Sequence, residues 1–264
     1  MSVYKNDNPE FLKLSIDSMI NQTIKPNQFI IVKDGPLTIE IDKVLLDYKT
    51  KYPYIVVVES KNNVGLGKAL DFGLGSCTND LIARMDADDI SLPNRCEELL
   101  KLFEKYPNLS LAGTNVDEFE DDPSVIISTR SVPNTYDEIV HFSKRRNPFN
   151  HPTVMFKKSQ VIRCGGYGDL RRRQDYDLFC RMLNMGCYAL NIDKSLLLFR
   201  VGEDYLKRRK SKETYRGTIA AAKLNYQRGY CSFIDYLYVK IGQSIIRFSP
   251  TWFTKRITAK ILRK

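Results

Sequence analysis

Apolar, β-rich runs alternate with segments of helical spacing through the first 90 residues of the chain. The runs that we interpret as strands are residues 29–32, 55–58 and 81–85. The segments that we interpret as helices are residues 9–20, 39–49 and 68–75. This alternation is typical of a parallel sheet whose strands are joined by crossover helices. Ser2-Val3-Tyr4 runs directly into a polar turn, which indicates the end of a first strand whose beginning is absent.

The pattern becomes mixed after residue 90. Ser91 and Pro93 predict the start of a helix over residues 93–105, with Ser91 as its N-cap and Pro93 in its first turn. The elements predicted further along are strands at residues 109–113, 153–157 and 196–201, a helix at residues 177–185 and helices from Ser211 onward. A chain of 264 residues with this order is long enough for one large α/β domain with an appendage.

The positive charge of the chain lies at its C-terminal end. Lys and Arg total 41 against 31 Asp and Glu, which gives a net charge of +10. Residues 207–264 hold fifteen of the basic residues and two acids, so this tail carries +13 and residues 1–206 carry −3. Apolar residues such as Ile245, Trp252 and Phe253 lie among these charges, a pattern typical of amphipathic helices on an anionic membrane surface. The alternative is that the apolar face packs on the preceding domain.

Cysteine usage and targeting signals bear on the compartment. The six cysteines form no Cys-x-x-Cys pair and only two histidines are present, which argues against a zinc site. Scattered cysteines of this kind are typical of free thiols in a reducing compartment. The sequence shows neither a signal peptide nor a run of about 18 apolar residues. We therefore expect a cytoplasmic protein that attaches peripherally to the inner face of the plasma membrane through residues 207–264.

Two predicted strands are followed closely by aspartates. Asp34 follows the first apolar run, and Asp86 follows the third and opens the cluster Asp86-Ala87-Asp88-Asp89. Ligands of open α/β sheets bind beyond the carboxyl ends of the strands, so we expect Asp34 and Asp86 at the same edge. Three neighbouring aspartates repel one another, and a divalent cation such as Mg²⁺ or Mn²⁺ relieves that repulsion. The alternative is a solvated loop that caps the following helix.

Two polar segments offer further candidates. Asn63, Gly65 and Lys68 precede a predicted helix in a turn that can admit a nucleotide closely, although the Gly-Lys-Ser/Thr ending of a P-loop is missing. His151 stands between two prolines in a stiff segment that suits recognition of a substrate. A lone histidine is nevertheless more often a packing or hydrogen-bonding residue than a catalyst.

An acidic pair stands near the start of the helix predicted at residues 177–185. Gly165-Gly166-Tyr167 leads through three arginines to Gln174-Asp175-Tyr176-Asp177-Leu178. An acid at the mouth of a helix after a glycine turn can be aimed into a cleft, and it can equally cap the helix. We interpret Asp175 as the chemical group and assign Asp177 mostly to capping.

In order and spacing these pieces resemble the bacterial family 2 glycosyltransferases with the GT-A fold, over roughly residues 1–205. The matching segments are Ser2-Val3-Tyr4, Asn21-Gln22-Thr23, Asp34-Gly35, Asn63-Val64-Gly65, residues 83–89, residues 151–156, Gly165-Gly166-Tyr167 and residues 174–178. The resemblance implies a Rossmann-like mixed, mainly parallel sheet flanked by helices in a catalytic domain over residues 1–206. A nucleotide-binding half would end near residue 115, an acceptor half would follow, and residues 207–264 would form a basic helical tail.

The resemblance also implies roles for individual residues. Those around the sugar-nucleotide donor would be Tyr4, Asp34, Asn63, Gly65, Lys68, Arg84 and Asp86, the last near the ribose and diphosphate. Asp88 would hold the metal, Asp175 would be the catalytic base, and His151 and Gln174 would face the acceptor. Many relatives carry Glu-Asp where this chain has Gln174-Asp175. The base is therefore kept, and the acid that precedes it in those relatives is lost.

The reaction implied by the resemblance is an inverting hexose transfer. The donor would be a nucleotide diphosphate sugar, with UDP as the expected nucleotide, and the acceptor a sugar on a polyprenyl diphosphate, as in O-antigen and capsule synthesis. A sugar nucleotidyltransferase is the nearer alternative, but it should carry a glycine-rich signature near the N-terminus that this chain lacks. A basic nucleic-acid-binding protein is the other alternative, but no recognised motif is present, so we expect no nucleic-acid partner.

Overall fold

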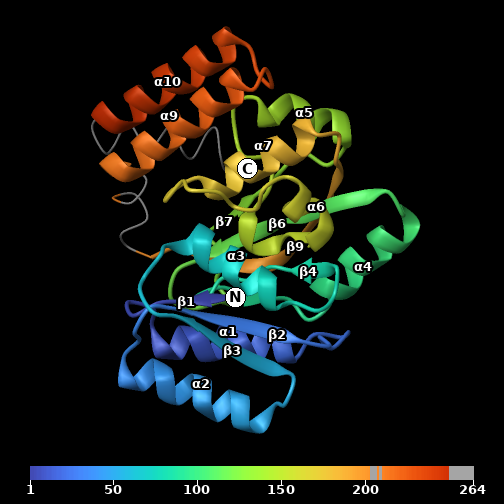
Figure 1. The fold of residues 1–264 in the computed structure, drawn as a ribbon, viewed down its shortest axis with the longest axis vertical. Coiled ribbons are helices and arrows are strands. Elements are labelled where there is room, and N and C mark those ends of the chain that lie inside the picture. The colour runs from blue at the N-terminus through green and yellow to red at the C-terminus, as the bar shows by residue number, and fades with distance from the viewer. Residues whose placement is uncertain (203–206, 208–209, 250–264) are drawn as a thin grey trace.

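A computed structural model describes residues 1–202, 207 and 210–249 as a mixed α/β fold (Figure 1). The strands are β1 (Ser2–Val3), β2 (Phe29–Asp34), β3 (Ile55–Ser60), β4 (Leu81–Ala83), β5 (Ile90–Ser91), β6 (Leu109–Phe119), β7 (Ser128–Arg130), β8 (Met155–Lys157) and β9 (Tyr188–Arg200). The helices are α1 (Pro9–Ile20), α2 (Ile39–Lys51), α3 (Leu66–Ser76), α4 (Arg95–Lys105), α5 (Tyr136–Ser143), the 3₁₀ turn η1 (His151–Thr153), α6 (Lys158–Arg163), α7 (Gln174–Asn184), α9 (Lys212–Gln227) and α10 (Phe233–Phe248).

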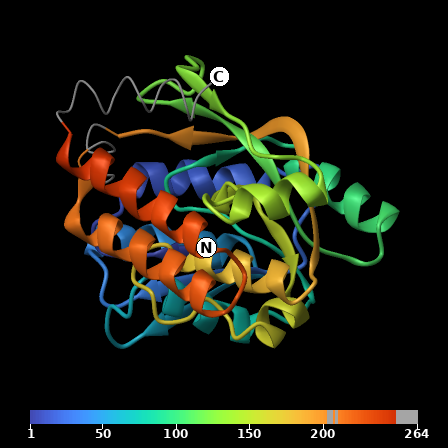
Figure 2. The same cartoon turned by 90° about the horizontal axis from the view of Figure 1, so that it is seen from above.

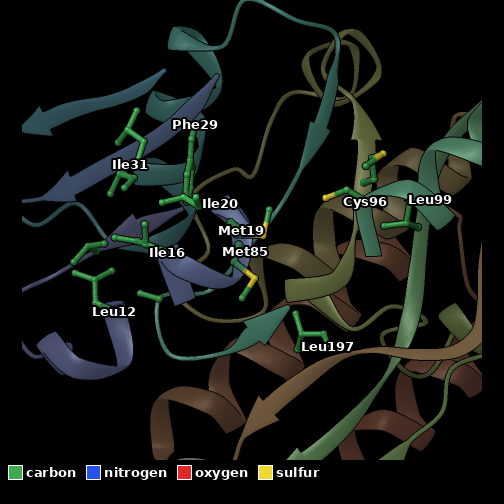
Figure 3. Close-up of a cluster of buried hydrophobic side chains, with 14 of the residues drawn as sticks. Leu12, Ile16, Met19, Ile20, Phe29, Ile31, Met85, Cys96, Leu99 and Leu197 are labelled. Carbon is green, nitrogen blue, oxygen red and sulfur yellow. The ribbon is translucent and has the colours of Figure 1, made fainter. Parts of the chain in front are cut away.

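A small parallel sheet of order β1-β2-β3 lies between helices. Side chains alternate across β2, so Phe29 and Ile31 join a core with α1 and α2 (Figure 3), whereas Ile30 and Val32 face Ala69 of α3. Because both faces are covered, β2 is a continuous apolar run. The confirmed strand and helix positions in this half follow from that local pattern.

The larger sheet has the order β4-β8-β6-β9-β5, with β7 paired to β6. Only β6 and β9 pair in parallel within it, and the other pairs are antiparallel. The strand at residues 81–85 was expected to continue the parallel βα alternation, but β4 instead pairs antiparallel with β8. A cavity of about 510 Å³ lies between β2 and β4, beside the two-residue β1, and separates the two sheets. The strand itself is present as predicted, but its partner is not the one expected.

Helix ends differ from the predictions at two places. Asn94 is the N-cap of α4, so the predicted start with Ser91 as cap is wrong, and Ser91 instead belongs to β5. Helix α7 begins at Gln174, three residues before the predicted start, which brings Asp175 into its first turn. Arg173 precedes α7 with φ of 67°, in the left-handed region that non-glycine residues rarely adopt.

Helices α9 and α10 form a hairpin beside α7 (Figures 1 and 2). Ala221 of α9 packs against Tyr176 and Cys180 of α7, and Arg145 forms an ion pair with Asp235 of α10. The part of the tail that packs on the catalytic domain therefore includes α9 and the inner face of α10. Trp252 and Phe253 lie outside the described residues. Among the described helices, none has both the length and the apolarity needed to cross a membrane.

Candidate active site

The acidic cluster follows β4, as predicted. One carboxylate oxygen from each of Asp86, Asp88 and Asp89 lies within 4.8 Å of the others. Asp89 is buried, and burial followed by the charges of Asp88 and Asp86 raises its pKa well above the usual range. Its Oδ2 atom is buried without a hydrogen-bond partner among the described residues. Three hard oxygen donors, one of them buried and unsatisfied, fit a divalent cation such as Mg²⁺ or Mn²⁺.

Arg200, at the end of β9, fixes the geometry of this cluster. Its backbone N–H donates to Asp89 Oδ1 at 2.9 Å, and its Nε donates to the carbonyl of Asp88 at 3.0 Å. The guanidinium also lies over the rings of Phe11 and Phe119, at 3.8 and 4.5 Å from their centroids. Arg200 was not among the residues predicted from the sequence. The available signal was a charged residue inside the apolar run at residues 196–201.

A fourth carboxyl group, in the loop after β1, is affected by the charges of the cluster. Asp7 accepts a hydrogen bond from the Tyr4 backbone N–H at 2.8 Å. Burial raises the pKa of Asp7 to about 6, and the charges of Asp88 and Asp86 add to the effect. This residue was also missed, because its distance from the cluster along the chain gave no local signal.

Two buried arginines connect the cluster to the rest of the fold. Arg84 pairs with the Asp86 carboxylate, while its Nε and Nη1 are without hydrogen-bond partners among the described residues. Arg95 is fully buried and donates through Nη1 to the carbonyls of Arg84 and Pro152, at 3.0 and 3.1 Å. Arg95 therefore links the end of β4 to η1, the turn that carries His151.

Asp34 organises the loop that follows β3. Its Oδ1 accepts from the Val64 N–H at 2.7 Å and its Oδ2 from the Gly65 N–H at 3.1 Å, while Asn63 Nδ2 donates to the same Oδ2. Gly65 has φ of 87°, which favours glycine, and precedes α3 as its N-cap. Asp34, Asn63 and Gly65 thus form one hydrogen-bonded group. Asp34 ends a strand of a different sheet from the strand before Asp86, so the expectation that the two carboxylates share one sheet edge is wrong.

Two other predicted donor residues lie at the surface. Lys68 Nζ pairs with Asp169 at 3.0 Å, and more than half of the Lys68 side chain is exposed. Tyr4 is 36% exposed, in the turn that Asp7 stabilises. Neither side chain lines the cavity beside the acidic cluster.

A cavity of about 450 Å³ extends from the end of β4 to the start of α7. The predicted site residues that line it are Arg84, Asp86, His151, Gln174 and Asp175. Asp175 Oδ2 accepts a hydrogen bond from Asn147 Nδ2 at 2.7 Å, which orients the carboxylate. Gln174 is buried over Gly67, where an added Cβ would lie 3.2 Å from Gln174 Cγ. Asp86 of the acidic cluster and the candidate base Asp175 therefore face the same space, whereas Asp88 and Asp89 do not line it.

His151 is buried and paired. Its Nε2 shares a hydrogen bond of 2.9 Å with the Tyr167 hydroxyl. Burial, followed by the charge of Arg84, lowers the pKa of His151 well below the usual range, so the ring is neutral at physiological pH. The ring lies on the wall of the cavity as a neutral hydrogen-bonding group.

The predicted role of Asp177 as a helix cap is wrong, because this residue lies inside α7 and forms ion pairs. Its carboxylate binds Arg181 one turn along α7 and Arg228 at the end of α9. No side-chain cap hydrogen bond is made at the N-cap of α7. Asp177 therefore joins α9 to the helix that carries Asp175.

Comparison with known proteins identifies the family of this chain. The family described as Glycosyl transferase family 2 matches residues 1–174. The chain is also 35% identical over 264 residues to the UDP-Gal:alpha-D-GlcNAc-diphosphoundecaprenol beta-1,3-galactosyltransferase of Escherichia coli, a match that covers 100% of this chain and 95% of that protein. The chain belongs to glycosyl transferase family 2. This glycosyltransferase therefore has the enzyme class that the sequence predicted.

Two further similarities extend this result. The chain is 32% identical over 241 residues to the amylovoran biosynthesis glycosyltransferase AmsE of Erwinia amylovora, covering 89% of this chain and 90% of that protein. The mannosyltransferase PcManGT from Pyrobaculum calidifontis, solved in complex with GDP-Man and Mn²⁺, superposes with a TM-score of 0.66 at 15% identity, covering 98% of this chain and 72% of that chain. The second similarity confirms that this glycosyltransferase has the expected GT-A fold.

Proposed function

We propose that this glycosyltransferase transfers a hexose from a UDP-linked donor to a saccharide carried on a polyprenyl diphosphate, with inversion at the anomeric carbon. The observation that carries this proposal is the single cavity that joins Asp86 to Asp175. The similarity to a galactosyltransferase whose name specifies UDP-Gal and a diphosphoundecaprenol acceptor supports the substrate classes. The products would be repeat units of a surface polysaccharide.

The proposed chemistry uses Asp175 as the base. The acceptor hydroxyl oxygen attacks the anomeric carbon while the bond from that carbon to the donor diphosphate oxygen breaks, and the leaving diphosphate takes the bonding electrons. Asp175 accepts the hydroxyl proton, and Asn147 holds its carboxylate in place. A divalent cation held by Asp86, Asp88 and Asp89 would supply electrostatic stabilisation of the leaving diphosphate.

The other predicted site residues remain part of the proposal. Asp34, Asn63 and Gly65 would shape the nucleoside side of the donor site through their shared hydrogen bonds. Tyr4, Lys68 and Arg84 would complete the donor site, and His151 and Gln174 would face the acceptor. Lys68 would have to leave its exposed pair with Asp169, a small cost for an ion pair at the surface.

The test of the base is Asp175→Asn. We expect this variant to lose transfer by about 10²-fold or more, because proton removal by a positioned base typically contributes that much. UDP binding in the presence of Mn²⁺, measured by calorimetry, should stay within about twofold of the wild type. Asp47→Asn is the matched control, because Asp47 is exposed on α2 and belongs to no part of the proposed site. Full transfer activity in Asp175→Asn, or loss of its UDP binding, would contradict the assignment.

The outer face of α10 supports attachment to a membrane. Apolar side chains at helical spacing are exposed along it, namely Phe233, Ile234, Leu237, Tyr238, Ile241, Ile245 and Phe248. Lys240 is exposed on the same helix, and residues 207–264 carry the net charge of +13. Such a surface suits the interface of an anionic bilayer, which is where a polyprenyl-linked acceptor resides. We therefore propose peripheral attachment at the inner face of the plasma membrane.

Cosedimentation with vesicles of phosphatidylglycerol and phosphatidylcholine tests the attachment. Ile234→Glu with Ile245→Glu should reduce binding, since each change puts a charge on the proposed contact face. Ile39→Glu with Leu46→Glu is the matched control, because Ile39 and Leu46 are 84% and 62% exposed on α2. Equal binding by the two double variants would refute attachment through α10.

A further inference from the structure

The cavity that holds Asp175 is strongly basic. Seven arginines and two aspartates line it, so its wall carries a net positive charge. The charge of three of these arginines is balanced by partners, because Arg84 pairs with Asp86, Arg130 with Glu118 and Arg145 with Asp235. A positive wall beyond these pairs favours a second anionic group in addition to the donor diphosphate.

We attribute this remaining positive charge to Arg171 and Arg172. Both are exposed and line the cavity, and neither forms a hydrogen bond or ion pair with another described residue, although Arg172 interacts electrostatically with exposed Glu213 of α9. They lie four and three residues, respectively, before Asp175 along the chain. The part of the lining near them includes Thr214 and Thr218 of α9. An anion held there would therefore lie between the proposed base and the α9–α10 hairpin.

The loop that carries these arginines is fixed in position. Arg173 has the left-handed φ of 67°, the only such non-glycine residue in the described chain. Its Nε donates to Thr218 Oγ1 of α9 at 3.1 Å. At Gly217 of α9, an added Cβ would lie 2.8 Å from both the Cβ and the carbonyl oxygen of Arg172. A strained residue and a close backbone contact that only glycine allows indicate a functional placement of this loop.

We propose that Arg171 and Arg172 bind the diphosphate of the acceptor, in a site separate from the metal-dependent donor site. This inference rests on the proposed function, because it takes a lipid-linked diphosphate as the acceptor. Guanidinium groups suit this ligand, since their planar donors bind phosphate oxygens in pairs. With the diphosphate at this loop, the acceptor sugar extends toward Asp175. The lipid then leaves along α10, whose outer face is apolar.

The test uses the purified full chain and farnesyl diphosphate, a lipid diphosphate without sugar, in the presence of EDTA. Calorimetry should show binding to the wild type, and Arg171→Gln with Arg172→Gln should weaken it by about tenfold or more, because two charge-assisted contacts are lost. UDP affinity with Mn²⁺ should change by less than about twofold in the same variant. Lys43→Gln with Lys49→Gln on α2 is the control, because it removes the same two positive charges from exposed positions.

Other results would overturn either the arginine site or the proposed function. Unchanged farnesyl diphosphate affinity in the arginine variant would overturn the site, as would equally tight binding of farnesol, which lacks the diphosphate. A parallel loss of UDP affinity would assign the arginines to the donor and also overturn the proposal. Failure of the wild type to bind UDP with Mn²⁺ would contradict the proposed function instead, so the two failures are distinguishable.

Discussion

Arg200 and Asp89, 111 residues apart in the chain, are joined by a hydrogen bond of 2.9 Å from the Arg200 backbone N–H to the buried Asp89 carboxylate. The same arginine uses its side chain to hold the carbonyls of Asp88 and Glu120. The end of β9 therefore shapes the loop that bears the proposed metal ligands. Residues that support ligands in this way tune metal affinity without touching the metal.

Arg200→Ala should weaken metal-dependent donor binding. The variant keeps the backbone N–H but loses both side-chain contacts to carbonyls and the packing on Phe11. We expect the affinity for Mn²⁺, measured by calorimetry in the presence of UDP, to fall by about tenfold, the lower end of the effect for groups that support ligands. Arg163→Ala, at an exposed position, is the control. Unchanged Mn²⁺ affinity in Arg200→Ala would show that the loop keeps its shape unaided.

Asp177→Asn should destabilise the fold strongly. The Asp177 side chain is 5% exposed and binds both Arg181 and Arg228, so the change leaves the largely buried charge of Arg181, whose side chain is 14% exposed, uncompensated. Breaking such a pair typically costs about 3–5 kcal/mol. Asp169→Asn, which breaks the exposed pair with Lys68, should cost about 0–1 kcal/mol. Urea unfolding measures the free energy of unfolding of both variants. Equal losses would mean that the ion pairs of Asp177 stabilise the junction between α7 and α9 no more than an exposed pair does.

The regular elements of the first half were predictable because their pattern is local. β2 is buried on both faces and therefore reads as an apolar run, and Asn8 caps α1 through hydrogen bonds to Glu10 and Phe11. The partner of a strand is not local information. β4 is three residues long, and its pairing with β8 depends on residues 155–157, far along the chain. The same apolar run would fit a parallel sheet equally well.

The candidate site was likewise predictable only where its residues stand in a local pattern. Asp86, Asp88 and Asp175 could be proposed from the sequence because each stands at a marked position, after an apolar run or near the predicted start of a helix. Arg200 and Arg95 were missed because their function consists of contacts to distant carbonyls. In the sequence alone, a buried arginine with such contacts cannot be distinguished from an arginine at the surface. Residues that support a site are thus less visible in sequence than residues that carry its chemistry.

The stability of the protein should fall in acid through His151. The folded state lowers the pKa of this buried ring, so it stays neutral where the unfolded chain takes up a proton. Stability due to this group is therefore complete above the usual histidine pKa of about 6.5 and falls below it, by up to about 1.4 kcal/mol per pH unit. His151→Gln should show a smaller drop in Tm between about pH 7.5 and about pH 5.5 than the wild type. His141→Gln, at an exposed position, should behave as the wild type.

Gly217 and Gly242 provide a matched pair on α9 and α10. An added Cβ at Gly217 would meet Arg172 at 2.8 Å, whereas nothing lies within 4 Å of one at Gly242. Gly242→Ala should therefore stabilise the protein by about 0.5–1 kcal/mol, because alanine is the better helix former. Gly217→Ala should lose that gain and displace the arginine loop, which lowers farnesyl diphosphate affinity while the helical circular dichroism stays unchanged. If both variants stabilise the protein and bind farnesyl diphosphate equally, the contact between Gly217 and Arg172 does not position the arginines.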